Sequence, residues 1–337
     1  MPTPLVTILV PTYRRPGPLS DCLQSIELAG LAADDVEILV CDNASPDGTP
    51  QVVAGHQTRH QLRYVRRAEN LGARRNIRLG AGEAWGEWVL FLTDDDRLDS
   101  QGARALLPIL RFRRDLGYVV SSFRSVDPEG RVLRGWSPAR VDQELPPGPR
   151  TSARWAASGW VFSRLAFRRD VLDFIFWDRH LANAYPSVLL AARSLLHAPG
   201  LYLARSLVDH AVGNLVHWEE FGEGQYAIWR KTHLDYAEVL EVAYADAGID
   251  SPSALRAASR WRRQALGQFI AAAIGLSDGP TRLRADREAL ASAFRVPVPY
   301  VNGQVILAQT LRPARRVQAA LARCWAEAGP RSPRPSR

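Results

Sequence analysis

The sequence predicts an α/β fold, in which a mostly parallel sheet is flanked by helices and followed by a helical C-terminal extension. Short β-branched runs alternate with stretches of helical periodicity over the first hundred residues, which is typical of parallel strands joined by helices. Turn residues and carboxylates follow directly on the apolar runs. From about 219 to 295 the pattern is helical.

The first hundred residues contain the clearest elements. The run at 5–15 is β-branched and is stopped by Pro11, so it predicts a buried strand. The elements expected after it are a helix at 17–29, a strand that breaks into turn residues within 36–49, a helix at 50–60, a strand at 62–67, a helix at 72–84 and a strand at 88–93.

The following segments are less regular. Residues 117–126 predict another strand, and 156–216 hold mixed elements. The segment 137–155 is rich in proline and arginine and has no periodicity, so it predicts a long loop, either a disordered connector or a mobile lid.

A further helix is expected after Pro313. One face of it carries apolar residues, namely Val317, Ala320, Leu321, Cys324 and Trp325, and the opposite face carries Arg315, Arg316 and Arg323. Such a helix either packs on the body of the protein or rests on an anionic membrane. Residues 329–337 are expected to be disordered.

Composition excludes several classes of protein. With 46% hydrophobic and 23% charged residues, the 337-residue chain is globular rather than disordered. Its formal net charge of +8 comes almost wholly from arginine, because Lys231 is the single lysine. Arginine suits phosphate recognition, although a GC-rich genome produces the same bias. No nucleic-acid-binding motif occurs, so no nucleic-acid partner is expected.

The expected location is the cytoplasm. Cys22, Cys41 and Cys324 have no metal or disulfide spacing, which favours a reducing compartment. The N-terminal end runs into an apolar strand without a basic region or cleavage site, so no leader peptide is expected. No apolar run reaches the roughly 18 residues of a membrane span.

Polar residues gather where the predicted strands end. They are Thr12, Tyr13 and Arg14 after the first strand, Asp42 and Asn43 after the second, Asn70, Gly72, Arg75 and Asn76 after the third, and Asp94, Asp95 and Asp96 after the fourth. Ligands of parallel sheets bind at the carboxyl ends of strands, so these residues are expected to share one site.

The three adjacent aspartates repel one another and therefore need a partner. Clustered carboxylates suit a hard divalent cation such as Mg²⁺ or Mn²⁺, which takes oxygen ligands and shares them with substrate phosphates. Arginine near a helix start suits a diphosphate. Together these residues indicate a nucleotide-diphosphate site with a metal.

Four segments, in this order, resemble the successive motifs of family 2 inverting glycosyltransferases of GT-A fold: VPTYRRPGPLSDCLQSI, ILVCDNASPDGT, NLGARRNIRLG and WVLFLTDDDRL. They lie within 5–100. The DDD cluster, SGWVFSR, AYPSVLL and VGNLVHW also resemble abequosyltransferase-like members, in part of 155–218.

The resemblance implies a Rossmann-like sheet and a function. A sugar would pass, with inversion, from a nucleotide-diphosphate sugar (UDP, dTDP or CDP) to a glycan or lipid-linked oligosaccharide in bacterial surface polysaccharide synthesis. The site would then lie at the inner face of the plasma membrane, to which the C-terminal amphipathic helix could attach the chain.

The resemblance also implies roles for the donor side. Pro11, Thr12, Tyr13 and Arg14 would line the nucleotide pocket, with Asp42 on the base or its ribose and Asn43 beside it. Arg75 and Asn76 match the ARN helix start near the nucleotide.

The aspartate cluster allows two registers. Many members have LDxDD, which puts Thr93 at the first acidic position and Asp95 at the metal; a literal DxD instead selects Asp94 and Asp96. We favour Asp95 as the principal metal ligand, with Asp94 towards the ribose and Asp96 assisting or bound through water. His210 or His217 would complete the metal shell.

The acceptor side departs from the family. The base often belongs to a Glu-Asp pair, but Asn183 and Ala184 stand at that position. Asp178 is the favoured base, with His180 and Asp173 behind it; a plain surface or capping role for Asp178 stays open. Gly159 and Trp160 resemble the acceptor loop, where Trp160 either stacks on a sugar or belongs to the core.

We therefore divide the chain into a transferase domain at 1–218 and a helical region at 219–328, followed by the tail. Within the domain, 1–100 would bind the nucleotide sugar and 101–218 the acceptor. Two alternatives remain: a nucleotidyltransferase, although PTYRRPGPL lacks the Gly-rich stretch typical of that class, and a degenerate domain that acts as a binding or scaffold protein.

Overall fold

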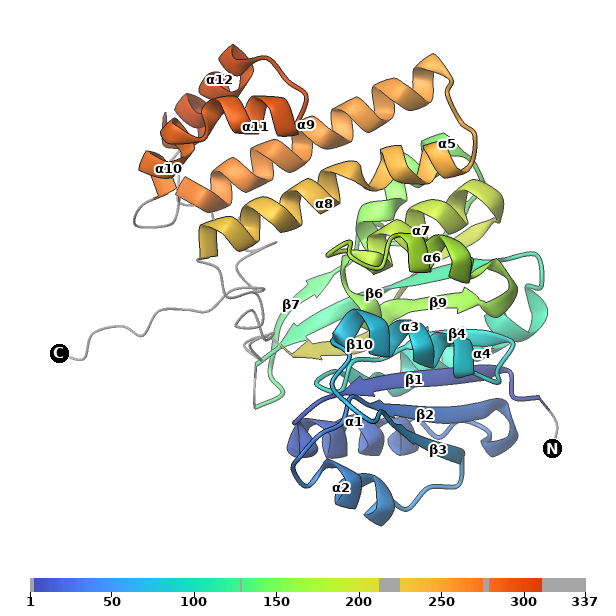
Figure 1. Ribbon diagram of the computed structural model, residues 1–337. Coiled ribbons are helices and arrows are strands. Elements are labelled where there is room, and N and C mark those ends of the chain that lie inside the picture. The colour runs from blue at the N-terminus through green and yellow to red at the C-terminus, as the bar shows by residue number, and fades with distance from the viewer. Residues whose placement is uncertain (1–2, 128, 212–224, 275–278, 311–337) are drawn as a thin grey trace. The chain divides into compact units, whose positions relative to one another are not determined.

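The computed structural model describes residues 3–127, 129–211, 225–274 and 279–310 (Figure 1). The chain forms two compact units, of which unit 1 comprises 1–182 and 186–212 and unit 2 comprises 183–185 and 213–337. The boundary predicted at 218 lies outside the described residues, as do the amphipathic helix expected after Pro313 and the tail.

Unit 1 is built on one mixed sheet. Its strands are β1 (Val6–Thr12), β2 (Val36–Asp42), β3 (Gln61–Arg66), β4 (Trp88–Phe91), β5 (Arg97–Leu98), β6 (Tyr118–Val126), β7 (Val132–Trp136), β8 (Gln143–Leu145), β9 (Leu165–Arg168) and β10 (Gly200–Ala211). Their order is β3-β2-β1-β4-β9-β6-β10-β5, with β7 on β6 and β8 on β10. The predicted α/β class is confirmed.

The N-terminal half of the sheet is parallel, as expected. β2 and β4 both pair in parallel with β1, and β3 pairs in parallel with β2. β9 enters antiparallel to β4, and β6 runs parallel to β10 beyond it. The register aligns Thr12 with Asp42, so the polar residues after these strands emerge at one edge.

Helices cover both faces of this sheet because alternate strand residues point to opposite sides. On one face, Ile8 and Val10 pack with α1 (Pro16–Leu28), α2 (Thr49–Gly55) and α4 (Ser100–Phe112). On the other, Leu9 packs with α3 (Ala73–Glu83), α5 (Pro149–Trp155), α6 (Phe174–Arg179) and α7 (Pro186–His197).

The long loop predicted at 137–155 is wrong in part. This segment contains β8, which pairs with β10, and α5, whose Trp155 is buried against Tyr202. Neither element shows periodicity because one has three residues and the other seven. Pro149 begins α5 at a position where a helix tolerates proline.

Unit 2 is helical, as predicted for its described part. It contains α8 (Gln225–Asp246), α9 (Pro252–Ile274), α10 (Gly279–Ala285), α11 (Arg287–Ala293) and α12 (Val298–Thr310). Tyr236 and Trp261 stack between α8 and α9. Asp235 on α8 accepts a hydrogen bond of 2.9 Å from Ala184 N–H, which holds the segment 183–185 in this unit.

No helix within the described ranges is both long enough and apolar enough to cross a membrane.

Candidate active site

Asp94 lies where β1 and β4 end side by side. Thr12 Oγ1 donates a hydrogen bond of 2.7 Å to Asp94 Oδ2, and Arg15 Nη1 lies 3.4 Å from Asp94 Oδ1. Arg15 Nη1 also donates to Asp95 Oδ2 at 2.6 Å. One guanidinium therefore faces two of the three carboxylates.

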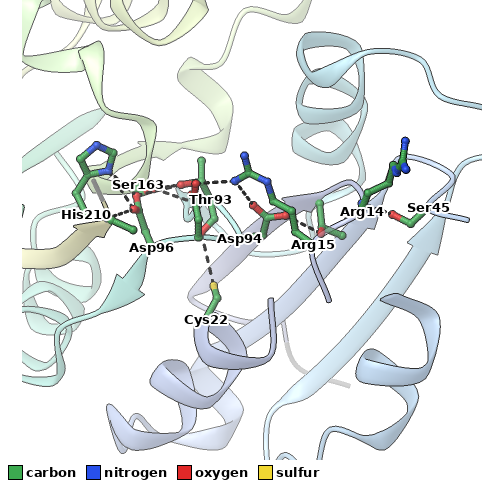
Figure 2. Close-up of polar contacts among 12 residues, drawn as sticks. Arg14, Arg15, Cys22, Ser45, Thr93, Asp94, Asp96, Ser163 and His210 are labelled. Carbon is green, nitrogen blue, oxygen red and sulfur yellow. Dashed lines mark hydrogen bonds and ion pairs between the residues drawn. The ribbon is translucent and has the colours of Figure 1, made fainter. Parts of the chain in front are cut away.

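Asp96 turns away from Arg15 and towards β10. Its Oδ1 lies 3.0 Å from His210 Nδ1 and accepts a hydrogen bond of 3.0 Å from Ala211 N–H. Its Oδ2 accepts from Thr93 Oγ1 at 3.0 Å, and Thr93 in turn contacts Ser163 Oγ at 2.8 Å (Figure 2). The protein thus engages both oxygens of Asp96.

Their surroundings make the three carboxylates chemically different. Burial and the charge of Asp95 raise the pKa of Asp94 to about 7, against the opposing effect of Arg15. Burial and the charge of Asp96 likewise raise the pKa of Asp95. Burial alone would also raise the pKa of Asp96, but the charge and hydrogen bond of His210 outweigh it, so this pKa is lowered.

The donors present can be compared with the expected metal. Among the described residues, no three His, Cys, Asp or Glu side chains form a ready-made metal centre. The carboxylates nevertheless fit a divalent cation, because burial and the repulsion between neighbouring aspartates raise the pKa values of Asp94 and Asp95, and a bound cation would stabilise both negative charges. Asp95 is the most accessible of the three, with 16% of its side chain exposed against 8% for Asp94 and none for Asp96.

Asp42 forms a second polar centre at the end of β2. Its Oδ1 accepts from Ser45 N–H at 2.9 Å and its Oδ2 from Tyr64 Oη at 2.5 Å. Arg66 Nε lies 3.5 Å from Oδ2. The protein thus fixes both oxygens of a fully buried carboxylate at the strand edge, and a direct contact of Asp42 with the base or ribose stays a prediction.

Two asparagines hold the backbone around this edge. Asn43 donates to Asn70 Oδ1 at 2.6 Å and accepts from Leu71 N–H at 2.8 Å. Asn76 donates to Cys41 O at 2.7 Å and accepts from Arg67 Nε at 3.0 Å. Because the protein engages both ends of each amide, these residues order the loop and the start of α3; a direct ligand contact stays a prediction.

The remaining predicted donor residues differ in exposure. Pro11 and Tyr13 are partly exposed at the end of β1, and Arg75 is exposed in the first turn of α3, after Gly72 with its positive φ of 78°. Arg14 contacts Ser45 Oγ through its own backbone N–H at 2.9 Å, and Figure 2 shows its guanidinium pointing away from the aspartates.

An aromatic group stands beside Asp96. The ring centroid of Trp160 lies 6.3 Å from that of His210, 5.8 Å from that of Phe123 and 6.2 Å from that of Trp136. Trp136 stacks on Phe123 at 5.9 Å. We call Phe123, Trp136, Trp160 and His210 the aromatic wall. Trp136 and Trp160 are only partly buried, so the aromatic wall can contact a ligand as well as the core.

Arg164 contacts the aromatic wall at Phe123. Arg164 is buried, lies 4.9 Å from the Phe123 ring and donates to Ser121 O at 2.8 Å and to Ser158 O. Gly159 lies between Ser158 and Trp160, and a Cβ there would meet Ser187 O at 2.9 Å. Gly159 is therefore required by close packing against α7, which does not test its predicted acceptor role.

The candidate bases lie on α6. Asp178 is 54% exposed and its Oδ2 accepts from Arg78 at 2.6 Å. Asp173 caps α6 by accepting from Phe176 N–H at 2.9 Å, a structural role. His180 ends α6 and contacts the Phe176 ring at 4.8 Å. His217 lies outside the described residues, whereas His210 does reach the cluster.

Comparison with known proteins assigns the domain. The family described as Glycosyl transferase family 2 matches residues 7–173, which include β1, β4 and the aspartates. The chain carries a family 2 glycosyltransferase domain.

Two relatives extend this assignment. The chain is 27% identical over 221 residues to abequosyltransferase RfbV of Salmonella typhimurium, which covers 60% of this chain and 66% of that one. It is 27% identical over 173 residues to the GalNAc(5)-diNAcBac-PP-undecaprenol beta-1,3-glucosyltransferase of Campylobacter jejuni, covering 50% and 53%. The chain thus spans about half to two thirds of the length of these glycosyltransferases.

Solved structures confirm the GT-A fold. TarS 1-349 of S. aureus in complex with UDP superposes with a TM-score of 0.55 at 16% identity, covering 90% of this chain and 91% of that one. The mannosyltransferase PcManGT of Pyrobaculum calidifontis, in complex with GDP-Man and Mn²⁺, gives 0.50 at 20% identity, covering 97% and 88%.

Several site residues of this glycosyltransferase domain escape sequence reasoning. Arg15, and not Arg14, reaches the aspartates, and two adjacent arginines give no signal to tell them apart. Tyr64 and Trp136 come from strands without any recognisable motif. Ser163 belongs to the SGWVFSR segment, which did indicate a functional loop.

Proposed function

We propose that the protein is a metal-dependent, inverting glycosyltransferase that moves a sugar from a nucleotide-diphosphate donor to a glycan or lipid-linked oligosaccharide. One observation carries the proposal. Three inequivalent aspartates lie at the carboxyl end of β4, where Arg15 and Thr12 contact Asp94, and they border a partly exposed aromatic wall. The acidic end suits the nucleotide-diphosphate donor and its metal, and the aromatic end suits the sugar acceptor.

The donor would bind along the strand edge. Asp42 would accept a hydrogen bond from the base or ribose, and Asp94 would face the ribose. Arg75, exposed at the first turn of α3, would meet the diphosphate. TarS was solved with UDP and PcManGT with GDP-Man and Mn²⁺, which supports a nucleotide-sugar donor and a divalent metal.

Asp95 would be the principal residue that holds the metal, since its side chain is the most accessible of the three. Asp96, with both oxygens engaged, would assist through water. When bound, the cation would stabilise the negative charge that develops on the leaving diphosphate. Arg15, paired with Asp95, can supply a second positive charge at the same place.

The acceptor would lie against Trp160 and Trp136. Its hydroxyl proton would pass to Asp178, its oxygen would form the new bond to the anomeric carbon, and the bond from that carbon to the diphosphate would break with inversion. Asp178 suits proton acceptance because it is exposed and because, among the described residues, its Oδ1 accepts no hydrogen bond.

The setting would be bacterial surface polysaccharide synthesis at the inner face of the plasma membrane. Two relatives support this setting, since one is an abequosyltransferase and the other is a glucosyltransferase named for an undecaprenol-linked glycan. The sequence of the C-terminal segment adds an arginine-rich amphipathic pattern that could meet such a membrane.

A donor screen tests the proposal. UDP-, dTDP-, CDP- and GDP-sugars are incubated with the full chain plus Mn²⁺, Mg²⁺ or EDTA, and released nucleoside diphosphate is measured. We expect metal-dependent release for one nucleotide class, together with a matching thermal shift. Release of sugar 1-phosphate instead of nucleoside diphosphate would indicate nucleotidyl transfer, and no metal-dependent nucleotide binding would leave only a scaffold role.

The base assignment has its own test. Asp178→Asn should abolish transfer while leaving the affinity for donor and Mn²⁺ unchanged, because Asp178 acts on the acceptor. Arg78→Gln is the matched control, since it breaks the same ion pair and keeps the carboxylate. If Asp178→Asn retained transfer, the base would lie elsewhere.

A further inference from the structure

A groove on unit 1 lies outside the site described above. It has a volume of about 1020 Å³ and runs between α4 and the segment 140–142, with residues 203–205 of β10 as a third wall. α4 packs against β10 here, so the groove belongs to one rigid part of the sheet and its covering helix. Neither the aspartates nor the aromatic wall line it.

The groove is strongly basic. Arg104, Arg140 and Arg205 line it, and all three are exposed. Asp142 is the one carboxylate among its lining residues, and its Oδ1 already accepts from Ala204 N–H at 2.8 Å. Within the described residues, neither Arg140 nor Arg205 forms an ion pair. Their charge is therefore available to an anion from outside.

Projecting apolar side chains stand beside these arginines. Val141 lies in the groove and is 66% exposed. Ile109 also lines it, and Phe112, one turn further on the same side of α4, is 77% exposed. Leu28, 69% exposed, adjoins Ala29, whose carbonyl accepts from Arg104 Nε at 2.9 Å.

We propose that this face, defined by Arg104, Arg140, Arg205, Leu28, Phe112 and Val141, docks on an anionic phospholipid surface. Guanidinium groups pair with lipid phosphates, and exposed apolar side chains enter the boundary between headgroups and acyl chains. A soluble anion would explain the arginines but not the apolar side chains around them. Arginine and aromatic residues are also enriched in protein interfaces, and a face that binds a protein partner would give no preference for anionic vesicles.

The position of this face also fits the chemistry of the site. Arg205 and His210 lie on the same strand, five residues apart, which corresponds to at most about 17 Å. An oligosaccharide linked to a lipid could span that distance from the membrane to the aromatic wall. This use of the docking face rests on the proposed function, whereas lipid binding itself does not, because it is measured without donor or acceptor.

Vesicle co-sedimentation of the full chain tests the proposal. Vesicles of phosphatidylcholine with phosphatidylglycerol are compared with vesicles of phosphatidylcholine alone. The wild type should bind the anionic vesicles, and Arg104→Gln/Arg140→Gln/Arg205→Gln should bind at least about tenfold more weakly, since each arginine near an anionic surface contributes substantially. Phe112→Ser/Val141→Ser should also weaken binding while all charge is kept.

Two controls remove the same charge elsewhere. Arg256→Gln/Arg260→Gln/Arg287→Gln changes three exposed arginines of unit 2, and Arg315→Gln/Arg316→Gln/Arg323→Gln changes the C-terminal segment. The unit 2 variant should keep most of the binding, and the C-terminal variant should lose less than the groove variant, because its segment would be a second, separate membrane contact. Loss confined to the C-terminal variant, or no preference of the wild type for anionic vesicles, would overturn the proposal. The wild type could instead bind soluble diphosphate but no vesicles. If the groove variant then lost diphosphate binding, the ligand of this face would be a soluble anion and not a membrane.

Discussion

Arg15 Nη1 lies 2.6 Å from Asp95 Oδ2 and 3.4 Å from Asp94 Oδ1, so one guanidinium faces a partly exposed carboxylate and a buried one. Asp96, by contrast, pairs with His210 on the other side of the cluster. The three consecutive aspartates therefore belong to two different electrostatic environments. One is shared with Arg15 and is partly open, and the other is closed by protein.

Arg15→Met should weaken donor binding. It removes a charge next to the proposed diphosphate, and a hydrogen bond to a charged group typically contributes enough to change affinity about ten- to hundredfold. Isothermal titration with the preferred nucleotide and Mn²⁺ measures this. Arg14→Met is the comparison, because the Arg14 guanidinium lies 6.0 Å from the Tyr13 ring and points away from the aspartates (Figure 2). Equal losses in both variants would contradict the assignment of Arg15.

The aromatic wall should act on the acceptor and not on the donor. Trp160→Ala and Trp136→Ala should each raise KM for the acceptor several-fold while the donor Kd stays unchanged, because they remove stacking area beside Asp96. Replacement by Phe should restore part of the affinity. Trp85→Ala is the control, because Trp85 is an exposed tryptophan whose ring contacts Arg63. A weaker affinity for the donor would show that the aromatic wall binds the donor and not the acceptor.

Asp94 should destabilise the metal-free protein at neutral pH. Its pKa is raised from 3.8 to about 7, so folding favours the protonated form. The stability that protonation supplies is complete below pH 3.8 and is lost as the pH rises towards 7. Thermal melts should therefore show Asp94→Asn to be more stable than the wild type at pH 8, with the difference shrinking towards pH 4. Equal melting curves at both pH values would show that Asp94 ionises without cost.

The sequence predicted the parallel half of the sheet well, and the reason is physical. β1, β2 and β4 are buried, β-branched or apolar runs that end in turn residues, and nothing in their tertiary surroundings alters that pattern. β8 and α5 could not be predicted because they are short and because contacts with β10 and Tyr202 stabilise them. Local propensity carries little information in such elements.

The sequence likewise predicted only part of the candidate site. Strand ends identified Thr12, Asp42 and Asp94, because the topology of a parallel sheet brings those positions together. Side-chain direction was not available from sequence, so Arg15 was missed beside Arg14. Trp136 was missed because it reaches the wall from β7, a strand outside every recognised motif.

We propose that Asp95 holds the metal and that Asp96 supports it from within the protein. The most direct test of this proposal is the affinity for nucleotide in the presence of Mn²⁺, measured by isothermal titration for Asp95→Asn and Asp96→Asn. We predict that Asp95→Asn abolishes metal-dependent binding and activity, whereas Asp96→Asn leaves a measurable remnant of both. Equal loss from Asp94→Asn and Asp96→Asn, with Asp95→Asn tolerated, would contradict the account and assign the metal to Asp94 and Asp96.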